Sequence, residues 1–179
     1  MRLRLIPAVI FIALFSDLSA SAQTPSGRDV VAPLAVTSFD PVARNSSFQL
    51  AVVLKIRTGF HVNAREVSAD YLIPTDLRAE VPTGFKADEI SYPKGTLRTF
   101  SFSKKPLNVY EGTTIVRMKL TTAADTPLGQ QRIPLKLRYQ ACSDEICLPP
   151  VTVDVQAKFT VVAEPAAAKP AHSEFFKLK

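Results

Sequence analysis

Few residue types in this sequence can build a metal or catalytic centre. The 179 residues include only two cysteines and two histidines, and they contain no Gly-rich phosphate loop, no G-x-S-x-G element and no H-E-x-x-H element. His172 lies in a linker-like tail, and no C-x-x-C or H-x-x-x-H pairing supports a zinc site. The neighbouring carboxylates Asp144 and Glu145 point apart in an extended segment, which does not suit paired acid and base chemistry. We therefore expect no metal and no cofactor, and the two cysteines remain as candidates for chemistry.

The positive charge of the chain is modest. The formal net charge is +6, the excess is spread along the sequence, and Lys104-Lys105 is the only adjacent basic pair. Such a distribution favours a solvated basic face over a nucleic-acid-binding patch. We expect no nucleic-acid partner.

The first residues have the order of a secretory signal peptide. A basic head, Met1-Arg2-Leu3-Arg4, precedes an apolar run over residues 5–15 and a small, polar stretch with Ala20 and Ala22 in A-x-A spacing. The apolar run is shorter than the roughly 20 residues that span a bilayer, which argues against the alternative of an uncleaved anchor. We expect cleavage after Ala22, export to the periplasm and no stable membrane span. Thiols outside the cytosol are not held reduced, so the cysteines can pair there.

Short apolar runs with period-two alternation fill the body of the chain. Alternation places one face of each strand in a core and leaves charged residues on the other face. Several such runs, with turn residues between them and no convincing amphipathic helix, predict an all-β, antiparallel β-sandwich. The predicted strands cover residues 34–39, 48–57, 77–81, 85–92, 114–121, 133–139 and 151–161.

The same pattern divides the chain into four segments. Residues 1–22 form the predicted signal peptide, and 23–33 are expected to be a flexible N-terminal segment. Residues 34–163 form one domain without internal repeats. Residues 164–179, rich in Ala and Pro and ending near Phe175-Phe176, are expected to be a flexible tail.

Cys142 and Cys147 are close enough in sequence to form a disulfide across a tight turn. A ring of this size stabilises the fold by only about 2 kcal/mol in the loop-entropy estimate. Structural disulfides of sandwiches more often join distant strands, as in immunoglobulin domains. On spacing alone, a structural disulfide and a redox-active pair remain equally good interpretations.

The segment around the cysteines, Tyr139-Gln140-Ala141-Cys142 followed by Cys147-Leu148-Pro149-Pro150, closely resembles a known family. It is similar to the redox segment (Y-Q-x-C, then C-x-P-P) of the periplasmic N-terminal, or alpha, domain of the thiol:disulfide interchange protein DsbD. Further matches follow in order from about residue 36 to residue 162. They are Gly59-Phe60-His61-Val62-Asn63, Leu72-Ile73-Pro74-Thr75, Ile90-Ser91-Tyr92-Pro93 and Val109-Tyr110-Glu111-Gly112.

This resemblance implies an immunoglobulin-like sandwich and a thiol–disulfide oxidoreductase component that acts as a protein-disulfide reductase. Cys142 and Cys147 match the family's redox pair, with Cys147 expected to form the mixed disulfide and Cys142 to resolve it. The implied partners are thioredoxin-like proteins or domains. No membrane domain or thioredoxin-like domain accompanies the sandwich here, so we expect a separate protein, such as a membrane electron-transfer protein, to re-reduce it. The alternative is a non-enzymatic binding or assembly module with a structural disulfide.

The resemblance also indicates the surroundings of the pair. Family members shield their cysteines with a loop that carries a phenylalanine, and Phe100 or Phe102 occupies that place, with core packing as the alternative. His61 and Asn63 stand where well-known members have tyrosines, and Tyr139 precedes the first cysteine. A protonated His61 beside Cys142 would lower the thiol pKa, whereas an ordinary strand histidine would not.

Overall fold

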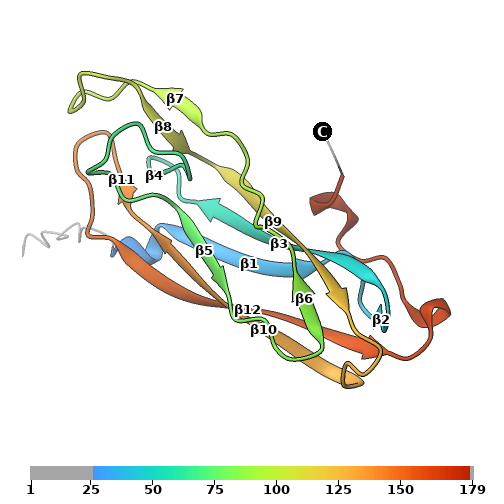
Figure 1. The fold of residues 1–179 in the computed structure, drawn as a ribbon. Helices are drawn as coiled ribbons and strands as arrows, with labels where there is room; N and C mark the ends of the chain where they lie inside the picture. Colours follow the sequence, from blue (N-terminus) through green and yellow to red (C-terminus); the bar gives the residue numbers. More distant parts are fainter. Residues whose placement is uncertain (1–25, 178–179) are drawn as a thin grey trace, which may run out of the picture.

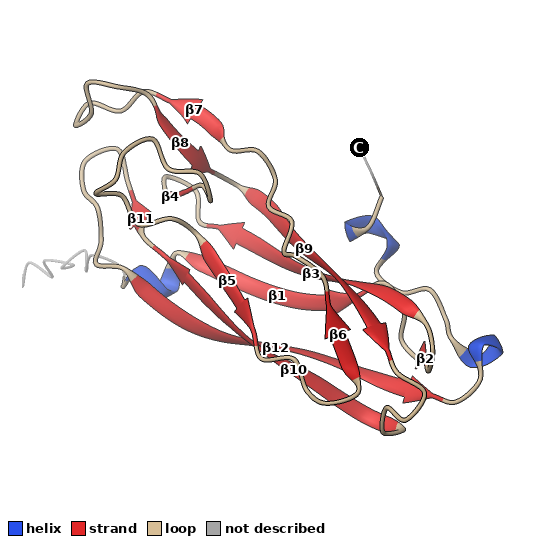
Figure 2. Ribbon diagram, in the orientation of Figure 1, coloured by secondary structure: helices blue, strands red, loops and turns tan. Residues whose placement is uncertain are grey.

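The alternating segments form an immunoglobulin-like sandwich of two four-stranded sheets, with a third small sheet at one end (Figures 1 and 2). This computed structural model describes residues 26–177. The first sheet contains β1 (Val31–Thr37), β3 (Ser47–Ile56), β9 (Thr113–Thr122) and β6 (Phe85–Ala87), in that order. The second contains β2 (Val42–Ala43), β12 (Val151–Val162), β10 (Gly129–Tyr139) and β5 (Asp76–Ala79). The small sheet contains β11 (Ala141–Cys142), β4 (His61–Asn63), β8 (Leu107–Tyr110) and β7 (Thr96–Arg98).

Neighbouring strands are antiparallel, apart from the short parallel pair of β2 and β12. The described residues contain three short 3-10 turns and no α-helix. No helix among them is long and apolar enough to cross a membrane. The predicted signal peptide and its cleavage after Ala22 fall in residues 1–25, outside the part of the chain that the structure describes.

The main core lies between the two large sheets. In β10, every second residue from Ile133 to Tyr139 is buried, while Lys136 and Arg138 face outward. The aromatic rings of Phe48 and Phe159, from opposite sheets, lie 5.3 Å apart. Burial of this apolar face is the main force that holds the sheets together. The all-β, sandwich prediction is therefore confirmed.

The N-terminal boundary differs from the sequence-based expectation. β1 begins at Val31, inside the segment 23–33 that was expected to be flexible, and a 3-10 turn, η1 (Gly27–Asp29), precedes it. Val30 and Val31 are buried against the core. The hydroxyl of Tyr139 donates a hydrogen bond to the Gly27 carbonyl (2.9 Å), which holds this turn to the end of β10.

Residues 164–177, the described part of the segment that was expected to be a flexible tail, lie against the sandwich. Two 3-10 turns, η2 (Pro165–Ala167) and η3 (Ser173–Phe175), flank a backbone bridge between Phe39 and Pro170. The guanidinium of Arg117 donates to the Phe175 carbonyl from two nitrogens, at 3.0 and 2.7 Å. The Ala- and Pro-rich composition suggested a solvated tail, but its backbone groups find partners on the sandwich.

Candidate functional site

Cys142 and Cys147 form a disulfide within a β-hairpin that continues from β10. The Leu148 N–H donates to the Ala141 carbonyl, and the Ser143 N–H donates to the Ile146 carbonyl, both at 2.8 Å. The two cysteines therefore form the non-hydrogen-bonded pair between these bonds, which is the position where facing Cα atoms approach most closely. Their Cα atoms are 4.0 Å apart and their sulfurs 2.04 Å apart.

Local sequence explains the tight turn between the cysteines. The Ser143 hydroxyl accepts hydrogen bonds from the backbone N–H groups of Glu145 and Ile146, both at 3.2 Å. Serine commonly closes a turn in this way, because its short side chain imitates a backbone acceptor. Pro149 and Pro150 then end the hairpin, since proline has no N–H to extend the ladder. The two sulfurs are thus held together by the backbone of the hairpin.

The two cysteines differ sharply in exposure. Cys142 is 1% exposed, because it lies between Cys147 on one side and His61 of β4 on the other. Cys147 is on the outer strand of the hairpin and is exposed. A partner protein can therefore approach Cys147 and not Cys142.

The small sheet has two different faces. Val62, Tyr110, Ala141 and Leu148 lie on one face and join the main core. Strand register places Cys142 beside His61, and Asn63 beside Val109, on the opposite face. A second apolar cluster covers that face and consists of Leu72, Phe100, Leu107 and Val109.

Three aromatic rings form a stack on this second face. The ring of Phe100 lies 4.0 Å from the imidazole of His61 and 5.4 Å from the ring of Phe102, and the His61 and Phe102 rings are 6.4 Å apart. Phe100 is buried, whereas Phe102 is 43% exposed. The Ser101 hydroxyl between them donates to the Asp144 carbonyl in the cysteine hairpin (3.1 Å). A hydrogen bond therefore joins the loop that carries both phenylalanines to the disulfide hairpin. In the sequence, the only indication of this contact is the position of Ser101 between the two phenylalanines.

His61 is neutral in the folded protein at neutral pH. Burial lowers its pKa to about 4; Asp144 raises the pKa by a smaller amount, and Arg98 lowers it further. Of the two alternatives for His61, its lowered pKa favours an ordinary strand histidine over a protonated imidazole that lowers the thiol pKa. Its Nε2 atom is buried and has no hydrogen-bond partner, and the same is true of Asn63 Oδ1.

The other two predicted site residues have architectural contacts. Asn63 donates through Nδ2 to the Ile73 carbonyl (3.0 Å), and its own carbonyl accepts from the Thr75 hydroxyl (2.6 Å). These bonds hold the loop after β4 and give the L-I-P-T element a structural role. Tyr139 is fully buried in the main core, where burial raises its pKa and its hydroxyl bonds to Gly27. The structure therefore places Tyr139 in the core and not in the aromatic stack.

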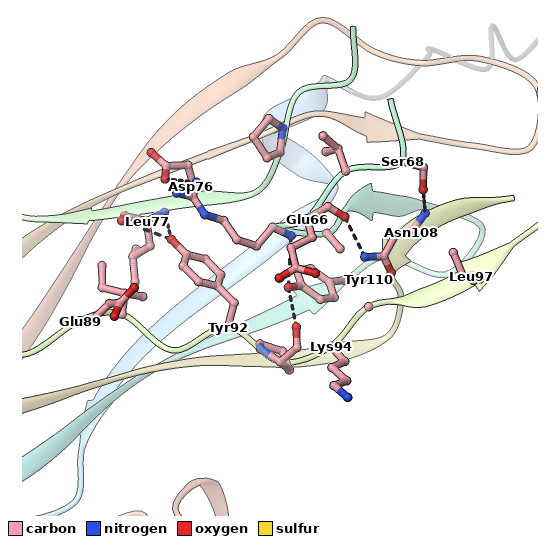
Figure 3. Close-up of a pocket in the computed structure, with 17 residues that line it drawn as sticks. Glu66, Ser68, Asp76, Leu77, Glu89, Tyr92, Lys94, Leu97, Asn108 and Tyr110 are labelled. Carbon is pink, nitrogen blue, oxygen red and sulfur yellow. Dashed lines mark hydrogen bonds and ion pairs between the residues drawn. The ribbon is translucent and has the colours of Figure 1, made fainter. Parts of the chain in front are cut away.

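A separate open groove of about 1140 Å³ lies beside the small sheet (Figure 3). Arg65 lies over the ring of Tyr92 at 5.2 Å and pairs with Asp76 at 2.6 Å. The hydroxyl of Tyr110 donates to the Pro93 carbonyl (2.8 Å), so much of the polar lining is bonded within the groove itself. Neither cysteine and none of the stacked rings lines this groove. Within residues 26–177, no group of three or more His, Cys, Asp or Glu side chains is placed to hold a metal.

The fold and the site together define an immunoglobulin-like β-sandwich with a disulfide hairpin on a small terminal sheet. The chain belongs to the family described as "Thiol:disulfide interchange protein DsbD, N-terminal", which matches residues 29–158. This match confirms the resemblance in the sequence, and the family implies thiol:disulfide interchange.

Other comparisons add little. No curated protein matches the chain. A solved family 123 glycoside hydrolase from Clostridium perfringens is 12% identical, and the similarity covers 74% of this chain and 28% of that one. Its TM-score of 0.25 is too low to support an argument about fold or function.

Proposed function

We propose that this domain exchanges thiol and disulfide states with thioredoxin-like proteins in the periplasm, through Cys142 and Cys147. The observation that carries the proposal is the unequal exposure of a disulfide-bonded pair, with Cys142 buried and Cys147 exposed. Exchange requires one sulfur that a partner can reach and a second that is held next to it. Family membership and the predicted signal peptide support the reaction class and the compartment.

The exchange needs no cofactor. A partner thiolate attacks the Cys147 sulfur, the disulfide breaks, and its electron pair leaves on the Cys142 sulfur, which takes up a proton. The partner's second thiolate then attacks the partner sulfur of the mixed disulfide, which oxidises the partner to a disulfide and releases Cys147 as a thiolate that takes up the second proton. Two electrons and two protons have then passed to the cysteine pair. The reverse sequence passes them on to an oxidised partner.

The aromatic loop controls access in this proposal. Phe100 and Phe102 are both stacked with His61, at 4.0 and 6.4 Å, and Ser101 bonds to the cysteine hairpin. We propose that partner docking displaces the exposed Phe102 and loosens the Ser101 bond. The reducing equivalents would come from a partner dithiol, such as a thioredoxin-like protein or a membrane electron-transfer protein.

Two serine variants test whether the two cysteines have separate roles in exchange. A thioredoxin with only its first active-site cysteine, activated as a mixed disulfide with thionitrobenzoate, is mixed with each variant. Cys142→Ser keeps the exposed thiol and should form a stable covalent complex. Cys147→Ser keeps only the buried thiol and should react at least about tenfold more slowly, because access limits exchange. Equal rates, or no complex with either variant, would overturn the proposal.

The reduction potential separates this function from a structural disulfide. A working pair should have a potential near those of exchange proteins, about −120 to −270 mV. A potential below about −300 mV would identify a structural bond and favour a binding or assembly module. Equilibration with thioredoxin of known potential gives the value.

A further inference from the structure

His61 is a buried, titratable group beside the buried cysteine, and the exchange mechanism above does not use it. Its residue exposure is 2%, and its Nε2 atom has no hydrogen-bond partner. Buried polar atoms in native proteins nearly always have a partner, so one without a partner needs an explanation. A hydrogen-bond partner that exists only in another state of the protein would supply that explanation.

Strand register identifies that partner. Cys142 is paired with Cys147 on one side and with His61 on the other, so the three side chains occupy consecutive positions on one face of the small sheet. Side chains directly opposite each other on neighbouring strands have Cβ atoms about 4.5–5.5 Å apart. In the oxidised pair, the Cys142 sulfur is bonded to Cys147 and has no proton to donate. After reduction it carries a thiol hydrogen.

Phe100 covers one face of the His61 imidazole and keeps water away from that face. Its ring is stacked on His61 at 4.0 Å with an angle of 19° between the planes, and it belongs to the second apolar cluster. His61 is therefore shielded from water on its Phe100 face and is directly opposite Cys142 in the strand register.

We propose that His61 accepts the proton of the Cys142 thiol during resolution of the mixed disulfide, which rests on the exchange function proposed above. The Cys142 S–H bond breaks, its proton moves to Nε2, and the Cys142 thiolate attacks the Cys147 sulfur. The bond between Cys147 and the partner sulfur breaks, and the partner leaves as a thiolate. The imidazolium then returns its proton to the departing thiolate. A buried thiol is otherwise a poor nucleophile, because only the thiolate attacks.

The charges around His61 are compatible with this role. Asp144 on the cysteine hairpin favours the imidazolium, and Arg98 on β7 disfavours it. Arg98 is itself paired with Glu111 at 3.2 Å. Burial keeps the imidazole neutral and thus able to accept a proton, and the negative charge that forms on Cys142 favours the imidazolium when it is needed.

The reduced protein is mixed with the aromatic disulfide dithiobis(nitrobenzoate), which reports two steps separately. Attack by Cys147 releases one thionitrobenzoate, and attack by Cys142 on the resulting mixed disulfide releases a second. The Cys142→Ser variant identifies the first phase, because it cannot perform the second. Both rates are followed by absorbance across about pH 5–9.

In the wild type, the second phase should vary little with pH near neutrality. In His61→Phe, which keeps a planar ring against Phe100, it should be about 100-fold slower at neutral pH, the lower end of what a positioned general base contributes. The variant's second-phase rate should rise about tenfold per pH unit, since each unit gives tenfold more free thiolate. The first phase should change by less than about twofold.

Two further variants exclude simpler explanations. In His61→Gln, the amide can accept a hydrogen bond but cannot take a proton, so it should keep the slow, pH-dependent second phase. Thr75→Val removes a buried hydrogen bond to the same strand and should leave the second phase unchanged. Thermal unfolding tests whether each variant folds. If His61→Phe does not fold, His61→Gln replaces it as the variant in which the second phase is measured.

Each outcome decides the inference. A wild-type second phase in His61→Phe, or full recovery of its rate and pH profile in His61→Gln, overturns the role of His61 as proton acceptor. Loss of the second phase in Thr75→Val would show general loosening of β4 and also overturn it. If Cys142→Ser forms no mixed disulfide with activated thioredoxin, the exchange function fails instead, which is a separate result.

Discussion

At the scale of single residues, burial makes two chemically identical cysteines different. Cys142 has a neighbouring strand on each side within the small sheet, whereas Cys147 is on the outer strand of its hairpin. The sequence shows two equivalent thiols, and only the register of β11 with β4 shows which of them is enclosed. The same register places His61 next to the enclosed one.

Acidification should destabilise the oxidised protein through His61. Its folded pKa is about 4, below the value of 6.5 of an unburied histidine, so the unfolded chain binds the proton first as the pH falls. Stability should therefore fall as the pH is lowered from about 6.5 to about 4 and level off below that. The contribution is on the order of 3 kcal/mol, from 1.36 kcal/mol per pKa unit. Urea unfolding at several pH values measures it.

The comparison of two variants isolates this effect from other titrating groups. His61→Phe should lose less stability between about pH 6.5 and 4 than the wild type, by the same order of magnitude. His172 is exposed, and His172→Gln serves as the matched histidine control. If His61→Phe and the wild type show parallel curves, His61 is not held neutral by burial.

The site is predictable from sequence where the residues carry a chemical signature. The motifs point to Cys142, Cys147, His61 and the Phe100 loop, and the structure places these elements together. The residues next to His61 in the sequence do not indicate that it is neutral, because its neutral state depends on burial by residues far along the chain. The motif also pointed to Tyr139, which packs in the core since period-two alternation in β10 directs it there.

At the scale of elements, long strands with one solvated face are predicted well. β9 and β10 alternate cleanly and extend the predicted ranges by only a few residues. The short strands β7, β8 and β11 were not predicted, and β4 was indicated only through the alternative of His61 as an ordinary strand residue. His61-Val62-Asn63 alternates between polar and apolar residues, but a run of three is shorter than the roughly four to eight residues over which alternation indicates a strand. The predicted strand 85–92 ends at Ala87, and single bonds such as Ser91 N–H to the Arg117 carbonyl (2.8 Å) continue along β9.

Gly95, directly before β7, should not tolerate a side chain. A Cβ atom there would overlap Asn108 Oδ1 and lie 2.6 Å from the Ala64 Cβ. Asn108 has little freedom to move, because its Nδ2 donates to the Glu66 carbonyl (2.7 Å) and its N–H donates to the Ser68 hydroxyl (2.8 Å), as Figure 3 shows. Gly95→Ala should therefore destabilise the fold by about 1–3 kcal/mol. Urea unfolding measures the loss.

The neighbouring exposed residue supplies the control for this packing argument. Thr96 is exposed in β7, and Thr96→Ala should change stability by less than about 0.5 kcal/mol. Because β7 leads into the Phe100 loop, Gly95→Ala should also increase the rate at which proteases cut that loop. Equal stability of the two variants would show that the contacts of Gly95 relax without cost.

At the scale of the whole molecule, the large sandwich is a rigid base for the small sheet. The disulfide hairpin continues from β10, which pairs with β12 along its whole length. Val62, Ala141 and Leu148 extend the main core into the small sheet. The hairpin is thus anchored by its backbone and by its core-facing side chains, while its other face remains available to the aromatic loop.

The C-terminal segment lies at the end of the sandwich away from the disulfide hairpin (Figure 1), so it should affect stability and not exchange. Truncation after Ala163 removes the backbone bonds of Ala171 to Ser38 (2.9 Å) and of Asp40 to Lys169 (3.0 Å), and leaves Arg117 without the Phe175 carbonyl. Each net hydrogen bond contributes about 1 kcal/mol, partly offset by the chain entropy that truncation releases, so we expect a loss of about 2 kcal/mol. Urea unfolding and the two-phase reaction with dithiobis(nitrobenzoate) test both parts. Unchanged stability would show that the segment does not bind the sandwich in solution, and altered rates of either phase would show that the two ends of the molecule are coupled.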